Sequence, residues 1–159
     1  MAKNAGKPKG RTVHIKNKKA YHNYELVEKV EAGISLVGTE VKSIRQGLAD
    51  LDGSYARIIN SECWLVGCKI AQYSEASINH EPIRNRKLLL HKNQIDKITI
   101  KLQQRGFTLV PLRIYLNDRN LIKVEIALAR GKRQYDKRAK LQQDQQKKDV
   151  ARSMKNYRR

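Results

Sequence analysis

The sequence predicts a mainly β domain, a small closed or partly open β-barrel, between two basic arms. Short runs of alternating apolar and polar residues outnumber helical patterns, and strands and helices do not alternate in the rhythm of a parallel sheet. The chain of 159 residues has the length of one domain. Closure into a barrel is favoured because it removes exposed strand edges.

Positive charge is concentrated at the two ends of the chain, whose net charge is +19. Residues 1–20 contain seven Lys and Arg and no acids, residues 21–129 contain 15 and 12, and residues 130–159 contain 12 and three. Arms this polar do not offset the ~1 to 2 kcal/mol of backbone entropy lost per ordered residue. We therefore expect them to be disordered until an anionic partner, nucleic acid or an anionic membrane, orders them.

The first part of the body is expected to hold a hairpin and a helix. Residues 23–33 and 34–38 are predicted to form two strands that meet near Gly33. The stretch TEVKSIRQG then has the pattern of a short helix. Thr39 is its expected N-cap and Gly47 its expected end.

A second hairpin is predicted from SYARIIN and ECWLVGCK, which meet at Asn60 and Ser61. Cys63 and Cys68 lie in the second of these strands at an odd separation, so their side chains are expected on opposite faces of the sheet. That placement is poor for a disulfide. It is equally poor for a metal site shared with histidines, and the spacing matches no common zinc pattern.

A long loop and a second helix come next. Residues 72–87 have little periodicity and are predicted to form a loop. Its Arg84, Arg86 and Lys87 are as consistent with phosphate contact as with a solvated surface. The stretch KNQIDKITIKLQQRG repeats apolar residues at helical spacing and is expected to stop at Gly106.

The last hairpin has the strongest pattern. FTLVPLRIYLN alternates apolar residues, and residues 121–128 alternate again after the turn NDRN. This predicts two antiparallel strands with one apolar face. Pro111 cannot donate a hydrogen bond to a ladder, so it is expected to mark an edge or a bulge.

No stretch carries a recognisable catalytic motif: the sequence has no Gly-rich phosphate loop, no GxSxG, no HExxH and no acid pair with metal-like spacing. No apolar run approaches the ~18 to 20 residues that span a bilayer, and the N-terminus lacks the features of a signal or transit peptide, which makes the cytosol the default location. A non-enzymatic RNA-binding protein is therefore favoured. A nuclease whose acids converge only in space is the less favoured alternative.

Five stretches carry a family resemblance when they are taken together. They are NKKAYHNYEL from Asn17, EAGISLVGTEVKSIRQG from Glu31, RKLLLHK from Arg86, TLVPLRIYLN from Thr108 and KVEIALARGKRQYDKR from Lys123. In this order and at these separations they closely resemble the SmpB family of SsrA-binding proteins, which accompany tmRNA in bacteria. The resemblance extends to Arg159, and GTEVKS followed by ALARGK is a very specific combination.

The resemblance implies a six-stranded antiparallel OB-like barrel with about three helices. It implies binding to the tRNA-like domain of tmRNA, delivery to stalled ribosomes and support of trans-translation, without catalysis, cofactor or metal. Residues 1–16 would form a flexible arm, 17–130 the RNA-binding domain, and 131–159 a tail that is disordered in the free monomer and helical on the ribosome. A structural ribosomal protein is the other reading left open by the basic arms and the small β body.

An RNA-contacting surface follows from the same resemblance. Its members are Asn17, Lys18, Lys19, His22, Tyr24, Glu31, Glu40, Lys42, Lys87, Leu90 and Lys123. The lysines would neutralise phosphates, Asn17 and His22 would hydrogen-bond to RNA, and Tyr24 would stack on an unpaired base. For Glu31, contact with a base amine and structural pairing are equally open, and the run 88–90 fits a buried strand better than direct contact.

The tail is expected to enter the decoding site and the empty messenger channel of the ribosome. The resemblance assigns this role to Gly131, Lys132, Arg133, Tyr135, Asp136, Lys137, Arg138, Val150, Met154 and Lys155. Val150, Met154 and Tyr157 would form the thin apolar stripe of a helix too weak to persist alone in water. Ser153 stands where the family has a larger aliphatic residue, and Ile83 and Asn85 stand where its central loop commonly has Arg and Pro.

Overall fold

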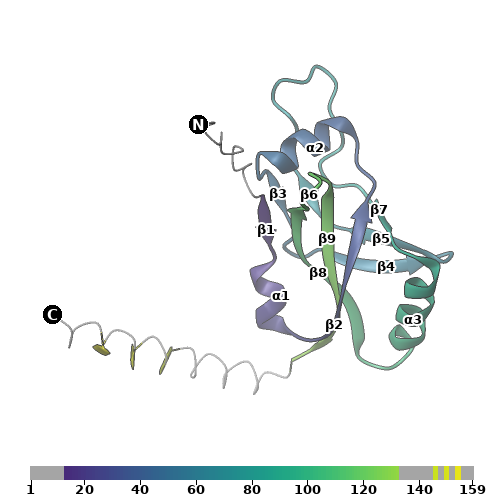
Figure 1. Cartoon of the computed structure of the whole chain (residues 1–159), viewed down its shortest axis with the longest axis vertical. Coiled ribbons are helices and arrows are strands. Elements are labelled where there is room, and N and C mark those ends of the chain that lie inside the picture. The colour runs from purple at the N-terminus through teal and green to yellow at the C-terminus, as the bar shows by residue number, and fades with distance from the viewer. Residues whose placement is uncertain (1–12, 133–144, 147–148, 151–152, 155–159) are drawn as a thin grey trace, which may run out of the picture.

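The structure is a computed structural model that describes residues 13–132, 145–146, 149–150 and 153–154. Its elements in chain order are β1 (His14–Lys16), α1 (Lys18–Asn23), β2 (Tyr24–Ile34), α2 (Gly38–Arg45), β3 (Ala49–Asp50), β4 (Tyr55–Ile59), β5 (Glu62–Val66), β6 (Lys69–Ile70), β7 (Arg86–Leu89), α3 (Lys92–Leu102), β8 (Phe107–Leu116) and β9 (Ile122–Gly131). The predicted mainly β class is therefore confirmed (Figure 1).

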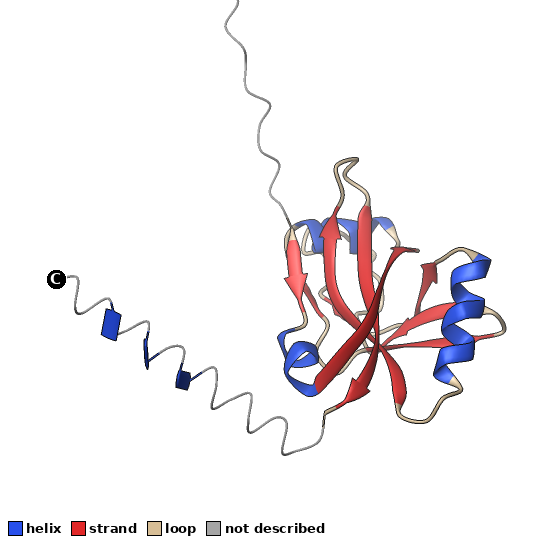
Figure 2. Ribbon diagram, turned by 60° about the horizontal axis from the view of Figure 1, so that its bottom comes forward, coloured by secondary structure: helices blue, strands red, loops and turns tan. Residues whose placement is uncertain are grey.

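The strands form an antiparallel sheet in the order β1-β8-β4-β5-β7-β2-β9. A further pairing between β8 and β9 joins the sheet into a ring, and β1 extends it beside β8. β3 and β6 pair separately. Figure 2 shows the helices at the periphery of the strands, with α1 and α3 on different sides.

Two of the predicted hairpins are confirmed. β4 and β5 pair around Asn60 and Ser61, whose φ angles of 50° and 59° are those of a tight turn that matches the twist of the strands. β8 and β9 pair along their length, and their register shifts between Pro111 and Arg113. The prediction of a bulge at Pro111 is therefore confirmed, because the residue that lacks an N–H sits at the irregularity.

The predicted turn at Gly33 is wrong. β2 continues through this position, where Gly33 pairs with Lys123 of β9 and with Leu89 of β7. Gly33 does not have a positive φ, so its backbone is compatible with a strand. The apolar residues that follow complete β2 and lead into α2.

α2 begins two residues earlier than predicted, with Val37 as the N-cap and Thr39 inside the first turn. The Val37 N–H donates to the Glu40 carboxylate at 2.8 Å, so an acid of the first turn satisfies this N-terminal donor. Gly47 follows the helix with a φ of 80°, which confirms the predicted end.

The body has a main core inside the ring and a smaller one beneath α1. The main core includes Ile44 of α2 and Ile98 of α3, and the smaller core joins Ala20 of α1 to Val110 and Leu112 of β8. The expectation that the last hairpin has one apolar face is wrong, since α1 covers its second face. Fully burying each such aliphatic side chain contributes roughly 1.5 to 3 kcal/mol.

Cys63 and Cys68 face the same interior, contrary to the prediction. β5 ends at Val66, and Gly67 with a φ of 75° redirects the chain, so both thiols are buried in the main core. Both cysteines are free. Burial raises the pKa of each thiol to about 11, which keeps them protonated and unreactive.

The loop predicted over 72–87 ends earlier than expected. β7 begins at Arg86, and Ile83 already forms an isolated bridge to Lys69. Arg86 is fully buried, so it is not part of a solvated or phosphate-contacting surface.

Candidate nucleic-acid interface

Asn17 is placed by α1, which it caps. Its side-chain oxygen accepts from the Ala20 N–H at 3.0 Å, and its amide nitrogen donates to the carbonyls of Leu51 at 3.0 Å and Pro111 at 3.1 Å. Asn17 is only 6 % exposed. These bonds use both amide N–H donors within the protein and the side chain is buried, so the expected hydrogen bond from Asn17 to RNA does not fit its position.

The exposed side of α1 carries three of the expected RNA contacts. Lys18, Lys19 and His22 are all exposed. Lys19 pairs with Asp52, and the hydrogen bond and charge of this carboxylate raise the pKa of Lys19. A surface pair of this kind is worth little in water, so a phosphate can replace Asp52 at small cost.

An open hollow of about 300 Å³ lies between α1, β4 and β8. Lys19, Tyr24 and Tyr55 are among its lining residues. Tyr24 is half-buried against the smaller core, and Tyr55 is 43 % exposed. Cations beside tyrosine rings suit an RNA strand, because the charges bind phosphate and the rings stack on bases.

Glu31 belongs to a network on the outer face of β8, β9 and β2. Its carboxylate accepts from the Tyr115 hydroxyl and lies 3.5 Å from Lys123 Nζ. The ring of Tyr115 stacks on His14 with centroids 6.5 Å apart, and the Arg113 guanidinium lies 4.7 Å from its centre. Burial and the hydrogen bond to Glu31 raise the pKa of Tyr115 to about 12. Glu31 therefore takes part in structural pairing, which is one of the two roles open to it.

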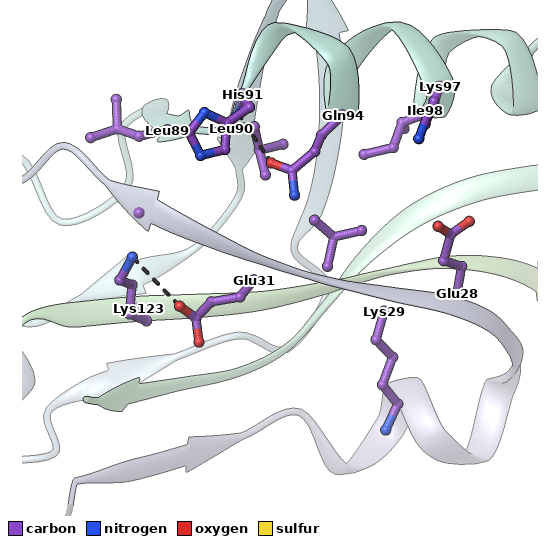
Figure 3. Close-up of a pocket in the computed structure, with 12 residues that line it drawn as sticks. Glu28, Lys29, Glu31, Leu89, Leu90, His91, Gln94, Lys97, Ile98 and Lys123 are labelled. Carbon is purple, nitrogen blue, oxygen red and sulfur yellow. Dashed lines mark hydrogen bonds and ion pairs between the residues drawn. The ribbon is translucent and has the colours of Figure 1, made fainter. Parts of the chain in front are cut away.

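A larger open cavity of about 690 Å³ lies where β2 meets the start of α3. In Figure 3, Gln94, Lys97 and Ile98 project from α3 toward β2, while Glu31 and Lys123 lie on the opposite side of that strand. Leu90 also lines this cavity and is half-buried against the main core. The cavity therefore joins three expected RNA contacts, Glu31, Leu90 and Lys123, to charged residues of α3.

Glu40 lies in the interior, contrary to its expected place on the RNA surface. It is fully buried and accepts hydrogen bonds from Arg84 at 2.7 and 2.8 Å and from Arg86 at 2.8 Å. Burial raises the pKa of Glu40, but the bonds from Arg84 and the Val37 N–H, with the charge of Arg86, outweigh burial and hold the pKa below its ordinary value. Glu40, Arg84 and Arg86 form what we call the buried ion cluster.

The Arg86 guanidinium also donates to the carbonyls of Cys68 at 2.7 Å and Pro82 at 3.1 Å. It thereby ties β7 to both ends of the preceding loop. Lys42 by contrast is exposed on α2, with Nζ 4.9 Å from the centre of the Tyr73 ring. Lys87 pairs with Glu62, and both side chains are 40 % exposed. Lys42 and Lys87 are accessible to phosphate.

The two tail residues nearest the body are well placed by it. Gly131 ends β9 opposite Tyr24 of β2. The Lys132 N–H donates to the Asn23 carbonyl at 3.0 Å, and its Nζ donates to the Tyr21 carbonyl at 3.1 Å. Both residues therefore pack against the α1 end of the body, and β9 runs one residue past the expected boundary at residue 130.

Further along the tail, residues 145–146, 149–150 and 153–154 are helical. Val150 is 55 % and Met154 67 % exposed, and the Ser153 hydroxyl donates to the carbonyls of Asp149 at 2.9 Å and Val150 at 3.0 Å. The apolar stripe is thus uncovered at these two positions. Several of the expected tail contacts lie outside the described residues: Arg133, Tyr135, Asp136, Lys137, Arg138 and Lys155, together with Tyr157 of the apolar stripe. Residues 1–12 of the expected flexible arm also lie outside them.

Sequence reasoning missed several residues of this surface. The sequence shows Tyr115 and Arg113 only as members of a strand, and Tyr55 only as part of a hairpin. For Tyr115 the missing signal is the strand register, which sets it in one cross-strand row with His14 and Lys123. Among the residues that the structure describes, no group of three His, Cys, Asp or Glu is arranged to hold a metal ion, and no helix is long and apolar enough to cross a membrane.

These features define a small β-rich protein whose exposed lysines and tyrosine rings suit a polyanionic partner. The family model "SmpB protein" matches residues 14–156, so the chain belongs to the SmpB family. Its similarity to curated relatives extends over nearly the whole chain.

One similar protein is the SsrA-binding protein of Syntrophobacter fumaroxidans, 50 % identical over 143 residues, which cover 89 % of this chain and 88 % of that one. Another is the SsrA-binding protein of Trichodesmium erythraeum, 46 % identical over 159 residues, with 99 % and 100 % covered. A solved chain described as "tmRNA-SmpB: a journey to the center of the bacterial ribosome" is 48 % identical, with a TM-score of 0.66 over 77 % of this chain and 86 % of that one.

Proposed function

We propose that this protein binds the tRNA-like domain of tmRNA and delivers it to stalled ribosomes for trans-translation. The observation that carries the proposal is membership of the SmpB family along residues 14–156. The exposed cations of α1 and the two surface hollows beside β2 and β4 support it, because they offer charge and stacking surface to RNA.

The architecture that fits this function is an OB-like barrel. The ring of β8, β4, β5, β7, β2 and β9 is consistent with such a barrel, and three helices lie around it. The protein acts as a monomeric RNA carrier in the cytoplasm without chemistry of its own. Its RNA surface consists of Lys18, Lys19, His22, Tyr24, Lys42, Lys87, Leu90 and Lys123, with Glu31 held beside them.

The tail is the part of the protein that contacts the ribosome in this proposal. In this proposal, residues from Gly131 onward enter the decoding site and the empty messenger channel. The exposure of Val150 and Met154 supports this, since a helix with an uncovered apolar stripe gains stability when a surrounding surface covers it. The channel would accept the tail only when no message occupies it.

Isolation of the protein from growing cells, followed by sequencing of the bound RNA, tests the function. One abundant tRNA-ended species is expected. Ribosomal RNA alone, present in equal amount with and without stalling, would identify a structural ribosomal protein instead.

Truncation after Lys132 tests the division between body and tail. This site preserves the bonds of Lys132 to α1, which a cut after Arg130 would remove. We expect affinity for tmRNA within roughly tenfold of the full chain, ~1.4 kcal/mol, and complete loss of peptide tagging. Normal tagging by the truncated protein would refute the role of the tail.

A further inference from the structure

Gly33 lies inside β2 without a backbone reason for glycine. The strand continues through it, it pairs on both sides, and its φ is not positive. Glycine weakens a strand interior, because it costs more conformational entropy and offers no side chain to pack. A glycine at such a position often marks a close approach by a ligand or another backbone.

The immediate neighbour of Gly33 is Leu89. A Cβ at position 33 would lie 3.2 Å from Leu89 Cβ and 3.4 Å from Leu89 Cδ1, so Leu89 would have to move by a few tenths of an ångström. Leu89 is itself 54 % exposed, at the end of β7. The Cδ1 end of Leu89 can move into this solvent, but Leu89 Cβ is held by the backbone of β7, so the close approach of β7 accounts for part of the preference for glycine.

Gly33 is also where two hollows meet. The 690 Å³ cavity beside α3 and a second open hollow of about 370 Å³ share Gly33, Leu89 and Lys123 among their lining residues. In Figure 3, Lys123 and Leu89 lie on opposite sides of β2. The second hollow extends from this point to Arg45 of α2 and to Leu121 before β9. We call the two hollows together the β2 groove.

The charge of the β2 groove suits a polyanion. Its acids are already compensated, because Glu28 pairs with Lys101 and Glu31 with Lys123. Lys97 at one end and Arg45 at the other line the groove and are exposed. Within the described part of the chain neither side chain has an ion pair or hydrogen bond. Each end of the groove therefore offers an uncompensated cation.

Exposed apolar side chains lie between these cations. Leu89 is 54 % and Leu121 55 % exposed, and both line the hollow that contains Arg45. Alternating cations and apolar surface suit an RNA strand, because its phosphates pair with the cations and its bases pack against the apolar atoms. A base-paired helix would present only its backbone, so an unpaired segment fits better.

We propose that the β2 groove binds an unpaired segment of RNA, and that Gly33 is the point at which this strand crosses β2. The inference rests on the proposed function and adds Gly33, Arg45, Leu89, Lys97 and Leu121 to its RNA surface. The absent side chain at position 33 provides the clearance, while Lys97 and Arg45 bind phosphates on either side of the crossing.

The test is affinity for a transcript of the tRNA-like domain of tmRNA, measured at fixed salt for Gly33→Val, Leu89→Gly and the double variant. Valine suits a strand, and the double variant removes the contact with Leu89 while still filling the groove. We expect Gly33→Val to bind at least about tenfold more weakly than the wild type, and the double variant to bind at least about tenfold more weakly than Leu89→Gly alone. Thermal unfolding confirms that each variant folds.

A double variant that binds as tightly as Leu89→Gly alone would overturn the inference, because glycine at position 33 would then serve only to leave room for Leu89. If Gly33→Val does not fold, the pair Gly33→Ala and Gly33→Ala with Leu89→Gly poses the same question with a smaller side chain. Failure of the wild-type protein itself to bind the transcript would refute the proposed function. Normal binding by every Gly33 variant would refute only the crossing.

A second measurement is independent of folding at position 33. Lys97→Gln and Arg45→Gln should each reduce the slope of log affinity against log salt by about 0.7, the value for one phosphate of a single strand. Arg57→Gln is the matched control, because Arg57 is exposed on β4 and lines neither hollow. Equal slopes for all three variants and the wild type would overturn the proposal.

Discussion

The buried ion cluster and the ion pairs of the outer surface use the same charged groups in opposite ways. Glu40 and Arg86 are fully buried and bonded on several sides. Lys19 with Asp52 and Lys87 with Glu62 are partly exposed pairs, each joined by one contact. In the interior a lost partner leaves an unsolvated charge, whereas at the surface water or phosphate replaces it. Burial therefore separates the charges that build the fold from those available to RNA.

The largest expected effect is that of Glu40→Ala. It leaves Arg86 buried without its counter-charge and removes the acceptor of the Val37 N–H. We expect unfolding free energy to fall by about 3 to 5 kcal/mol, as for other broken buried pairs. Urea denaturation measures this. If the free energy of unfolding fell by less than about 1 kcal/mol, the buried ion cluster would behave like a surface ion pair, and the difference between interior and surface charges would not hold.

A smaller loss is expected when Glu40 is protonated but keeps its shape. Because the folded protein holds the Glu40 pKa below its ordinary value of 4.5, this carboxylate stabilises the fold above that pH, and the contribution is lost as pH falls through the lower folded value. Urea denaturation from pH 6 downward, compared between wild type and Glu40→Gln, measures it. The variant should be less stable at pH 6 and show a weaker decline. Parallel curves would contradict this linkage.

Asn17→Ala compares a buried polar residue with its exposed neighbour at the start of α1. The substitution removes the cap and leaves the Leu51 and Pro111 carbonyls without their side-chain donor, so we expect a stability loss of about 1 to 3 kcal/mol. RNA affinity of the folded protein should stay within about threefold. Lys18→Ala, one residue on and exposed, should do the reverse. If Asn17→Ala and Lys18→Ala reduced RNA affinity equally, Asn17 would have to be counted among the RNA-binding residues.

The smallest effect on stability is expected at Lys87. Lys87→Gln and Glu62→Gln break the same exposed pair, so each should cost below about 1 kcal/mol. Only Lys87→Gln should reduce the salt dependence of RNA binding, by about 0.7 to 0.9 for one phosphate. Glu62→Gln frees the lysine and should bind RNA at least as tightly as wild type. An unchanged slope in Lys87→Gln would remove Lys87 from the RNA surface.

The sequence alone predicts those parts of the fold in which local pattern and long-range pairing agree. The β8–β9 hairpin and the turn at Asn60 and Ser61 are confirmed, because alternation and turn chemistry are both local signals. The prediction of a turn at Gly33 is wrong, because a glycine inside a strand and a glycine in a turn look the same in a sequence. The side of the sheet on which Cys68 lies depends on the positive φ of Gly67. A single backbone angle of this kind leaves no trace in the alternation of apolar and polar residues.

The candidate site follows the same division. Lys18, Lys19 and His22 project from the helix as the family resemblance implies. Asn17 and Glu40 do not, because their side chains are hydrogen-bonded to residues 34 to 94 positions away in the sequence. Hydrogen-bond partners this far apart in the sequence cannot be predicted from the spacing of residues. Tyr115 was missed for the same reason, since its role depends on the register that sets it beside His14.

Lys132 is bonded to α1 through both its backbone and its side chain. Because Lys132 is held to Asn23 and Tyr21 at the end of the helix that bears Lys18 and Lys19, the tail departs from a point anchored to that helix. RNA bound by Lys18 and Lys19 would therefore lie beside the residue from which the tail continues. One short helix would then hold both the RNA and the start of the tail in place.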